Sequence, residues 1–153
     1  MRAGLSRGRR TVALRKSHWL VAIATLGATD APREPLGLPT ETVLLLVAPW
    51  CAPCWDELKR LDGIAGAVVP LRVRVMSMED GPRARAMMIE VEPTRQWTPA
   101  LNDRGRVRAA LWARTPALPY SIVTDGNGRI CEEHGGGLEA ETARTLARHC
   151  AIR

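Results

Sequence analysis

Residues 42–54 read TVLLLVAPWCAPC, an apolar run that leads directly into two closely spaced cysteines. The run at residues 42–48 consists of β-branched and aliphatic residues and is too short for a typical helix. Such a run is typical of a strand that is buried on both faces of a sheet. After the cysteines, apolar residues recur at helical spacing, at Leu58, Leu61, Ile64, Ala65 and Val68. The sequence therefore predicts a strand that feeds a helix, with Cys51 and Cys54 at the helix start.

The rest of the chain continues an α/β pattern. Residues 71–77 alternate apolar and polar side chains as a second strand does, and residues 82–89 and 103–114 each favour a helix. Residues 121–124 and 129–133 are expected to form a hairpin, because the Asp-Gly and Asn-Gly pairs between them supply the positive φ angles of a tight turn. A closing helix is expected from apolar residues on one face, namely Leu138, Ala143, Leu146, Ala147 and Cys150.

The first 31 residues differ in charge from the rest of the chain. They carry a balance of +5, whereas the remaining 122 residues hold 16 basic and 15 acidic groups, a balance of +1. The basic head is followed by an apolar stretch, residues 19–28, and then by small residues, which is the order of an export signal. The stretch is shorter than the ~20 residues that a membrane-spanning helix needs. We expect residues 1–31 to be an export signal or anchor; the alternative is a first strand at residues 19–25.

The body of the chain shows a mixed charge and 4% aromatic residues. It therefore lacks the basic stripe and the stacking aromatics of a nucleic-acid-binding surface, and we exclude nucleic acid as a partner. Residues 32–41 contain three prolines and a glycine, which favours an extended linker. The length that remains, residues 42–153, suits one domain.

Two cysteines three positions apart at a helix start favour thiol-disulfide chemistry. The unpaired amides and the positive end of the helix dipole favour a thiolate and can lower the pKa of the first cysteine from about 8.5 to ~3.5–7.5. We expect Cys51 to be accessible and to attack a partner's disulfide, after which the shielded Cys54 resolves the mixed disulfide. The reverse sequence would oxidise a partner. The electrons pass through the two sulfurs, so the reaction requires no dissociable cofactor, but a thiol reductant protein must reset the pair.

The segments at residues 43–54 and 118–130, VLLLVAPWCAPC and LPYSIVTDGNGRI, resemble the thioredoxin superfamily, particularly the TlpA, ResA and DsbE-like thiol-disulfide oxidoreductases. The resemblance covers roughly residues 42–150. It implies a thioredoxin-like α/β fold with a mixed central sheet flanked by helices. It also implies an enzyme of the protein-disulfide reductase type, acting on protein disulfides or thiols. The implied location is the periplasm, either free or anchored to the membrane; the cytoplasm is the alternative.

The resemblance also assigns roles to single residues. Glu57 matches the acidic residue that follows the second cysteine by three, and it would manage the proton on Cys54; the alternative is a solvated helix glutamate. Pro119 matches the family's cis-proline opposite the dithiol, with Pro116 as the competing candidate. Leu45 departs from thioredoxin, which has a buried aspartate there. The residues expected to contact a substrate are Trp50, Pro53 and Leu118.

The remaining cysteines permit two interpretations. Cys131 and Cys150 are expected on the last strand and the last helix, which pack together in a thioredoxin-like fold. In an oxidising compartment they would form a structural disulfide; the alternative is two buried free thiols. The rival function is a metal-binding module, because Cys51, Cys54, Cys131 and His134 offer a tetrahedral zinc set. The position of the first pair at a helix start favours the redox function.

Overall fold

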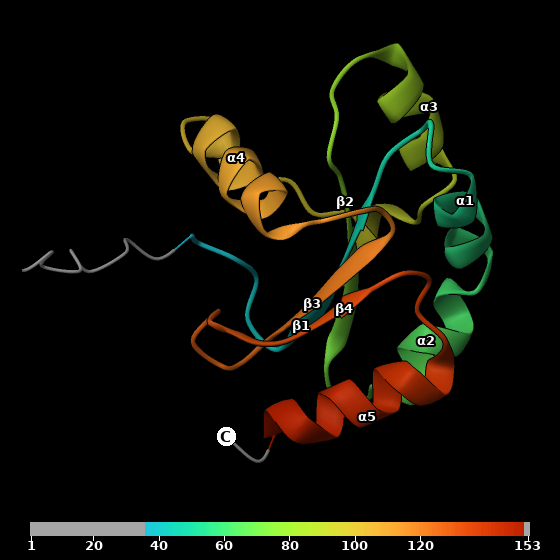
Figure 1. Ribbon diagram of the computed structural model, residues 1–153, viewed down its shortest axis with the longest axis vertical. Coiled ribbons are helices and arrows are strands. Elements are labelled where there is room, and N and C mark those ends of the chain that lie inside the picture. Colours follow the sequence, from blue (N-terminus) through green and yellow to red (C-terminus); the bar gives the residue numbers. More distant parts are fainter. Residues whose placement is uncertain (1–35, 152–153) are drawn as a thin grey trace, which may run out of the picture. The chain divides into compact units, whose positions relative to one another are not determined.

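The computed structural model describes residues 36–151, in which a four-stranded sheet carries helices on both faces (Figure 1). The expected export signal or anchor at residues 1–31, and the alternative strand at residues 19–25, lie outside the described residues. The elements follow in the order β1 (Thr42–Val47), α1 (Ala52–Lys59), α2 (Leu61–Ala67), β2 (Arg72–Ser77), α3 (Pro82–Ile89), the short 3-10 helix η1 (Pro93–Arg95), α4 (Arg104–Arg114), β3 (Tyr120–Thr124), β4 (Ile130–Gly135) and α5 (Ala140–Ala151).

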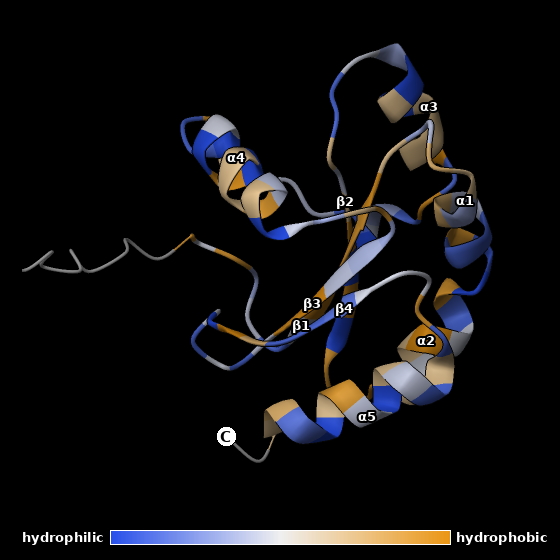
Figure 2. Cartoon of the chain, viewed as in Figure 1, coloured by the Kyte–Doolittle hydropathy of each residue, from blue (hydrophilic) through white to orange (hydrophobic). Residues whose placement is uncertain are grey.

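The sheet is mixed, and its strand order is β2-β1-β3-β4. β1 pairs parallel with β2 and antiparallel with β3, and β3 pairs antiparallel with β4. All six residues of β1 are buried, because the strand has a neighbour on each side and helices on both faces. In Figure 2 β1 is coloured as hydrophobic, whereas the edge strand β4 is mainly hydrophilic. The α/β class with a mixed central sheet, predicted from the sequence, is confirmed.

The turn between β3 and β4 is fixed by its own side chains. Asp125 Oδ1 accepts the backbone N–H groups of Asn127 at 2.8 Å and of Arg129 at 2.9 Å. Gly128 has a φ of +72°, and a Cβ at this position would lie 2.7 Å from the carbonyl oxygen of Leu38. Only glycine therefore fits both the conformation and the close approach, as the hairpin motif in the sequence indicates.

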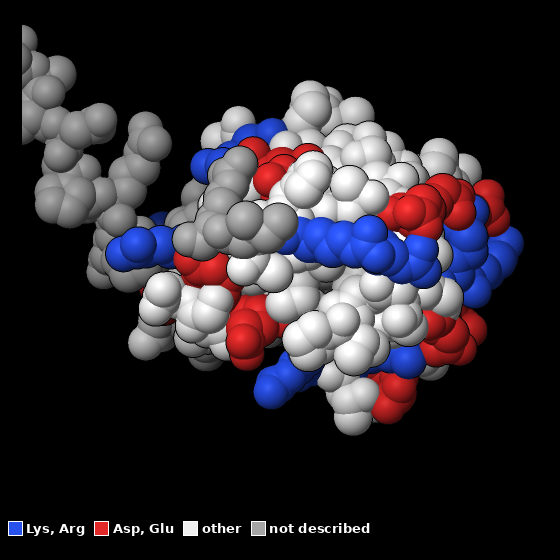
Figure 3. All heavy atoms as spheres, turned by 90° about the horizontal axis from the view of Figure 1, so that it is seen from below, with Lys and Arg blue, Asp and Glu red and all other residues white. Residues whose placement is uncertain are grey.

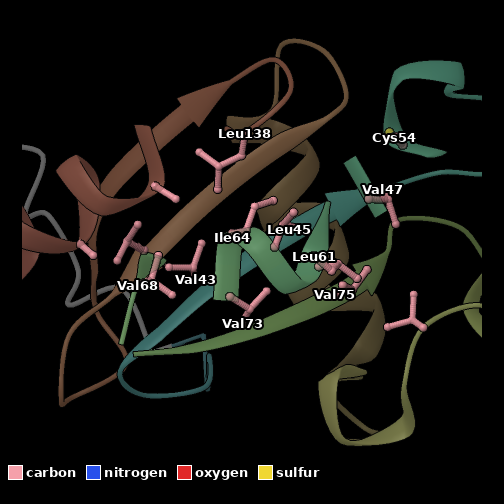
Figure 4. Close-up of a cluster of buried hydrophobic side chains, with 14 of the residues drawn as sticks. Val43, Leu45, Val47, Cys54, Leu61, Ile64, Val68, Val73, Val75 and Leu138 are labelled. Atoms are coloured by element: carbon pink, nitrogen blue, oxygen red, sulfur yellow. The ribbon is translucent and has the colours of Figure 1, made fainter. Parts of the chain in front are cut away.

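Alternate residues of β1 enter two separate cores, since successive side chains of a strand point to opposite faces. Leu44 and Leu46 pack in one cluster with Val107 and Leu111 of α4. The other cluster joins the sheet to α1, α2 and α5 and is drawn in Figure 4; its members include Val43, Leu45, Val47, Ile64, Leu138 and both Cys51 and Cys54. Figure 1 accordingly shows α4 on one side of the sheet and α1, α2 and α5 on the other. The dithiol is thus built into a hydrophobic core.

Two helix boundaries differ from the sequence prediction. The single helix expected after the cysteines is divided at Arg60, whose φ of −99° and ψ of 4° interrupt the helical path between α1 and α2. The closing helix begins at Ala140, so Leu138 precedes it, although Leu138 is fully buried as its place in the apolar pattern required. The apolar periodicity predicted which residues of these segments are buried. It did not predict the break at Arg60 or the start of α5 at Ala140.

The surface of the described residues carries both signs of charge. On the face drawn in Figure 3, acidic and basic side chains are interspersed. Within residues 36–151, no helix combines the length and the apolar character that a membrane span requires.

Candidate active site

Cys51 and Cys54 stand at the first turn of α1, directly after the buried strand β1. Cys51 is the N-cap of the helix, and its Sγ accepts the backbone N–H of Cys54 at 3.2 Å. The two residues form a disulfide with a Cα–Cα separation of 5.3 Å, which lies in the usual range. Pro53 is exposed in this first turn, where a missing N–H costs nothing because helix starts leave those donors unpaired.

The two cysteines differ slightly in exposure, but both are buried. Cys54 is fully buried, whereas 4% of Cys51 reaches the surface. The expected order is therefore present, yet Cys51 is less accessible than we predicted, because its disulfide draws the sulfur toward Cys54 in the core. Trp50, the residue before the pair, is 60% exposed. Trp50 therefore forms part of the exposed surface next to Cys51 in the chain.

Glu57 lies one turn after Cys54 on α1 and is fully buried. Its Oε1 accepts the backbone N–H of Leu138 at 2.6 Å, while its Oε2 is buried with no hydrogen-bond partner among the described residues. Burial raises the pKa of the Glu57 carboxyl to about 7, against the opposing effects of the Leu138 hydrogen bond and the charge of Arg60. The alternative of a solvated helix glutamate is wrong.

The spacing of Cys54 and Glu57 places both side chains on one face of α1. Both are in the interior between the helix and the sheet, where the dielectric is low. A carboxyl group with a pKa of about 7 is divided between its two protonation states near neutral pH. The arrangement can therefore take up or supply a proton beside the inner sulfur.

Pro119 occupies the residue before β3, and the Leu118–Pro119 peptide bond is cis. The carbonyl oxygen of Pro119 accepts the N–H of Gly136 at 2.9 Å. Leu118 is half-buried and packs against the cluster that contains Cys51 and Cys54. The structure thus brings the Leu118 segment to the core that holds the dithiol. A second cis bond, Val69–Pro70, has no signal that we identified in the sequence.

Cys131 on β4 and Cys150 near the end of α5 form a second disulfide, with a Cα–Cα separation of 5.4 Å. The zinc set considered for the sequence is not assembled, because Cys131 is bonded to Cys150 and Cys51 to Cys54. Within the part of the chain that the structure describes, no group of three or more His, Cys, Asp or Glu side chains could hold a metal ion. The metal-binding alternative therefore lacks its ligand cluster.

Glu79 belongs to the site and was missed from the sequence. Its Oε1 accepts the indole Nε1–H of Trp50 at 2.6 Å. The parallel pairing of β1 with β2 explains the contact, because it brings the ends of both strands to one edge, with Val47 opposite Ser77. The sequence does contain a signal for Glu79, because it is an acidic residue two positions after the second predicted strand, residues 71–77.

No protein-family model matches this chain, and no curated protein matches it. Solved structures do match it. A thio-disulfide isomerase from Thermus thermophilus is 26% identical with a TM-score of 0.52, and the match covers 74% of this chain and 82% of that one. A thioredoxin-related protein from Neisseria meningitidis serogroup B is 15% identical with a TM-score of 0.54, over 82% of this chain and 96% of that one.

A third similar structure is the MTB protein dsbF, which is 20% identical with a TM-score of 0.50, over 70% of this chain and 78% of that one. Over the matched parts, the folds of these three proteins are similar to that of the chain described above. The resemblance to thioredoxin-like proteins that the sequence predicts is therefore confirmed at the level of the fold.

Proposed function

We propose that this chain, which has a thioredoxin-like fold, is a thiol-disulfide oxidoreductase that acts on protein partners as a disulfide reductase. The observation that carries the proposal is the Cys51–Cys54 pair at the first turn of α1, with the buried carboxyl of Glu57 one turn further on. The Thermus protein that shares the fold is named a thio-disulfide isomerase, which supports the same class of chemistry.

The first step uses the reduced pair. The backbone N–H of Cys54 points at Cys51 Sγ, and together with the helix dipole it favours the Cys51 thiolate over the thiol. The thiolate attacks one sulfur of the partner's disulfide, a mixed disulfide forms, and the partner's other sulfur leaves as a thiolate that takes a proton from water. Cys51 is the attacking residue because it is the outer member of the pair.

The second step releases the partner. The Cys54 thiol gives its proton to the Glu57 carboxylate and attacks Cys51 Sγ, so the Cys51–Cys54 disulfide forms and the partner leaves with its second thiolate. Two electrons pass to the partner in total. A pKa of about 7 suits Glu57 to this role, because a general base works best when its pKa lies near the operating pH. A thiol reductant protein then restores the dithiol.

Partner contacts are proposed for the surface around Cys51. Trp50 and Pro53 are exposed on either side of it, and Trp50 supplies a large apolar ring of the kind enriched in interfaces. Leu118, the residue before the cis-proline, packs against the core cluster that contains Cys51 and Cys54. These residues form the proposed substrate contact, with Pro119 fixing the path of the chain before β3.

The test is a pair of active-site variants in an insulin-reduction assay. Cys51→Ser abolishes exchange, whereas Cys54→Ser stops at the mixed disulfide and holds a partner that mass spectrometry can identify. The double variant Cys131→Ser, Cys150→Ser is the matched control and retains exchange. Normal turnover by Cys51→Ser would refute the assignment.

The direction of exchange is tested by equilibration with glutathione buffers. A reductase is expected to have a reduction potential nearer that of thioredoxin, ~−270 mV, than that of the oxidant DsbA, ~−120 mV. A reduction potential near ~−120 mV would indicate that the chain oxidises its partners, which is the opposite of the direction that we propose.

We also propose that the chain is exported, with residues 1–31 as a signal or membrane anchor. The support is the basic head before an apolar stretch, together with a second disulfide of the kind that persists in oxidising compartments. The test fuses residues 1–41 to a reporter enzyme that folds only where its disulfides form. Reporter activity equal to that of a leaderless fusion would favour the cytoplasm instead.

A further inference from the structure

A polar cavity of about 360 Å³ lies at the carboxyl end of β2, between α3 and α4. Three arginines line it, Arg85 from α3 and Arg104 and Arg108 from α4. Its acidic lining residues are Glu79 and Asp80. We call this cavity the arginine pocket, and its lining carries one more positive than negative charge.

Both acids in the arginine pocket already have partners. Arg108 binds Asp80 through two nitrogen atoms, with Nη2 at 2.9 Å from Oδ1 and Nη1 against Oδ2. Glu79 accepts the indole N–H of Trp50. Arg85 and Arg104, by contrast, form no ion pair with any carboxylate of residues 36–151. The pocket therefore offers two guanidinium groups without an ion-pair partner among the described residues, one on the exposed Arg85 and one on the half-buried Arg104.

Arg104 forms no hydrogen bond to an acceptor among the described residues, although its charge helps to lower the pKa of Asp80 in the same pocket. Arg104 is the first residue of α4, where the positive end of the helix dipole disfavours a cation. Its Nε is buried and has no hydrogen-bond partner among the described residues, and the same holds for Nε of Arg108. A buried donor without an acceptor destabilises the fold. An anion bound in the pocket would offset the positive charge of its lining.

The arginine pocket adjoins the segment that carries the dithiol. β1 and β2 end at the same edge of the sheet, with Val47 opposite Ser77, and Ser77 and Glu79 line the pocket. Trp50, next to Cys51 in the chain, is tied to the pocket wall by its 2.6 Å hydrogen bond to Glu79. A polypeptide that reaches Cys51 past Trp50 is therefore within a few residues of the pocket.

We propose that the arginine pocket binds a carboxylate of the disulfide partner, so that the chain prefers protein disulfides flanked by Asp or Glu; this rests on the proposed function. Guanidinium groups present paired N–H donors that match a carboxylate. The volume is near the lower end of ligand pockets, ~300–1,000 Å³, which suits one or two acidic side chains. Trp50 supplies the apolar contact, and Arg85 and Arg104 select the charge.

The binding test uses the oxidised protein and two cysteine-free peptides that differ only in Glu or Gln on each side of a central serine. We expect the Glu peptide to bind about 10-fold more tightly at low salt, and ~0.5 M salt to reduce the difference because exposed charges are screened. The double variant Arg85→Gln, Arg104→Gln loses the preference. Arg83→Gln is the matched control, because it removes one charge from the same helix but lies outside the pocket lining.

Calorimetry of the wild-type protein and of both variants, each with each of the two peptides, decides between these outcomes, with thermal unfolding to verify that each variant is folded. Equal affinity of the wild-type protein for both peptides, or a preference for Glu that survives the double arginine variant, would overturn the pocket assignment.

The exchange test repeats the comparison with disulfide-containing versions of the two peptides. The ratio of kcat/KM for the Glu peptide to that for the Gln peptide is expected to be about 10 in the wild type and in Arg83→Gln, and to approach 1 in the double arginine variant. Tight binding of the Glu peptide without exchange of either disulfide would reject the proposed function and leave the pocket intact. Exchange of both peptides without any binding preference would reject the pocket and leave the function.

Discussion

The two disulfides of this chain differ in where they meet the helices. Cys51 is the N-cap of α1, and its partner Cys54 follows in the first turn. Cys150 lies in the last turn of α5 and is bonded to Cys131 on the edge strand β4. A helix start favours a thiolate and a helix end disfavours it. The same bond is therefore placed for exchange at one site and for cross-linking at the other.

The surroundings sharpen the contrast between the two disulfides. The first closes a separation of 3 residues within one turn, so it restricts the unfolded chain little. The second closes a separation of 19 residues and fastens α5 to β4. The first also has a buried carboxyl beside it, that of Glu57. We infer that Cys51 and Cys54 serve chemistry and that Cys131 and Cys150 serve stability.

The largest expected effect comes from removing the second disulfide. The double variant Cys131→Ser, Cys150→Ser should lose about 3 kcal/mol of unfolding free energy, because a closed loop of this length restricts the unfolded chain by about that amount. Urea unfolding of the oxidised proteins measures the loss. A variant as stable as the wild-type protein would contradict the cross-linking role.

Much of this contrast was readable from local sequence. The apolar run at residues 42–48 and the CAPC motif specify β1 and the start of α1, since both patterns act over a few residues. The burial of Glu57 was not readable, because it depends on Leu138, which is 81 positions away and supplies the N–H that the carboxylate accepts. The apolar periodicity of α1 does not show which distant segment of the chain covers Glu57.

The arginine pocket illustrates the same limit. The helices over residues 82–89 and 103–114 were predicted, with α3 and α4 at nearly those bounds. Arg85 of α3 and Arg104 of α4 line one cavity at the end of β2. This placement depends on how α3 and α4 pack on opposite faces of the sheet. The sequence order alone does not place one helix relative to the other.

The second prediction compares thiol reactivity in the reduced protein. Cys51 should react with iodoacetamide about 10- to 30-fold faster at pH 7 than Cys131 or Cys150, because an ordinary thiol is only a few per cent ionised there while a helix start lowers the pKa. Timed labelling followed by peptide mass spectrometry gives the rate at each cysteine. Equal rates would remove the distinction between the two pairs.

The third prediction concerns the dependence of stability on pH at the first site. Because burial raises the pKa of Glu57 from 4.5 to about 7 in the folded chain, the unfolded chain releases this proton more readily. The Glu57 carboxyl therefore contributes most to the free energy of unfolding below about pH 4.5. This contribution is lost as the pH rises toward 7 and stays lost above that. The second disulfide has no part in this titration.

Glu57→Gln should accordingly leave the chain about 3 kcal/mol more stable than the wild type at pH 8, relative to the same comparison at pH 4, because the rise in the Glu57 pKa from 4.5 to about 7 is worth ~1.4 kcal/mol for each pKa unit. The hydrogen-bond cost of the buried amide is the same at both pH values, so it cancels from this comparison. Urea unfolding at both pH values measures the difference, with the exposed Glu90→Gln as the control. The same substitution should slow resolution of the mixed disulfide by ~100-fold, since the carboxylate that destabilises the fold at neutral pH is the base for Cys54. A variant that gained stability at pH 8 and kept full exchange would show that Glu57 is buried without a role in the proton transfer.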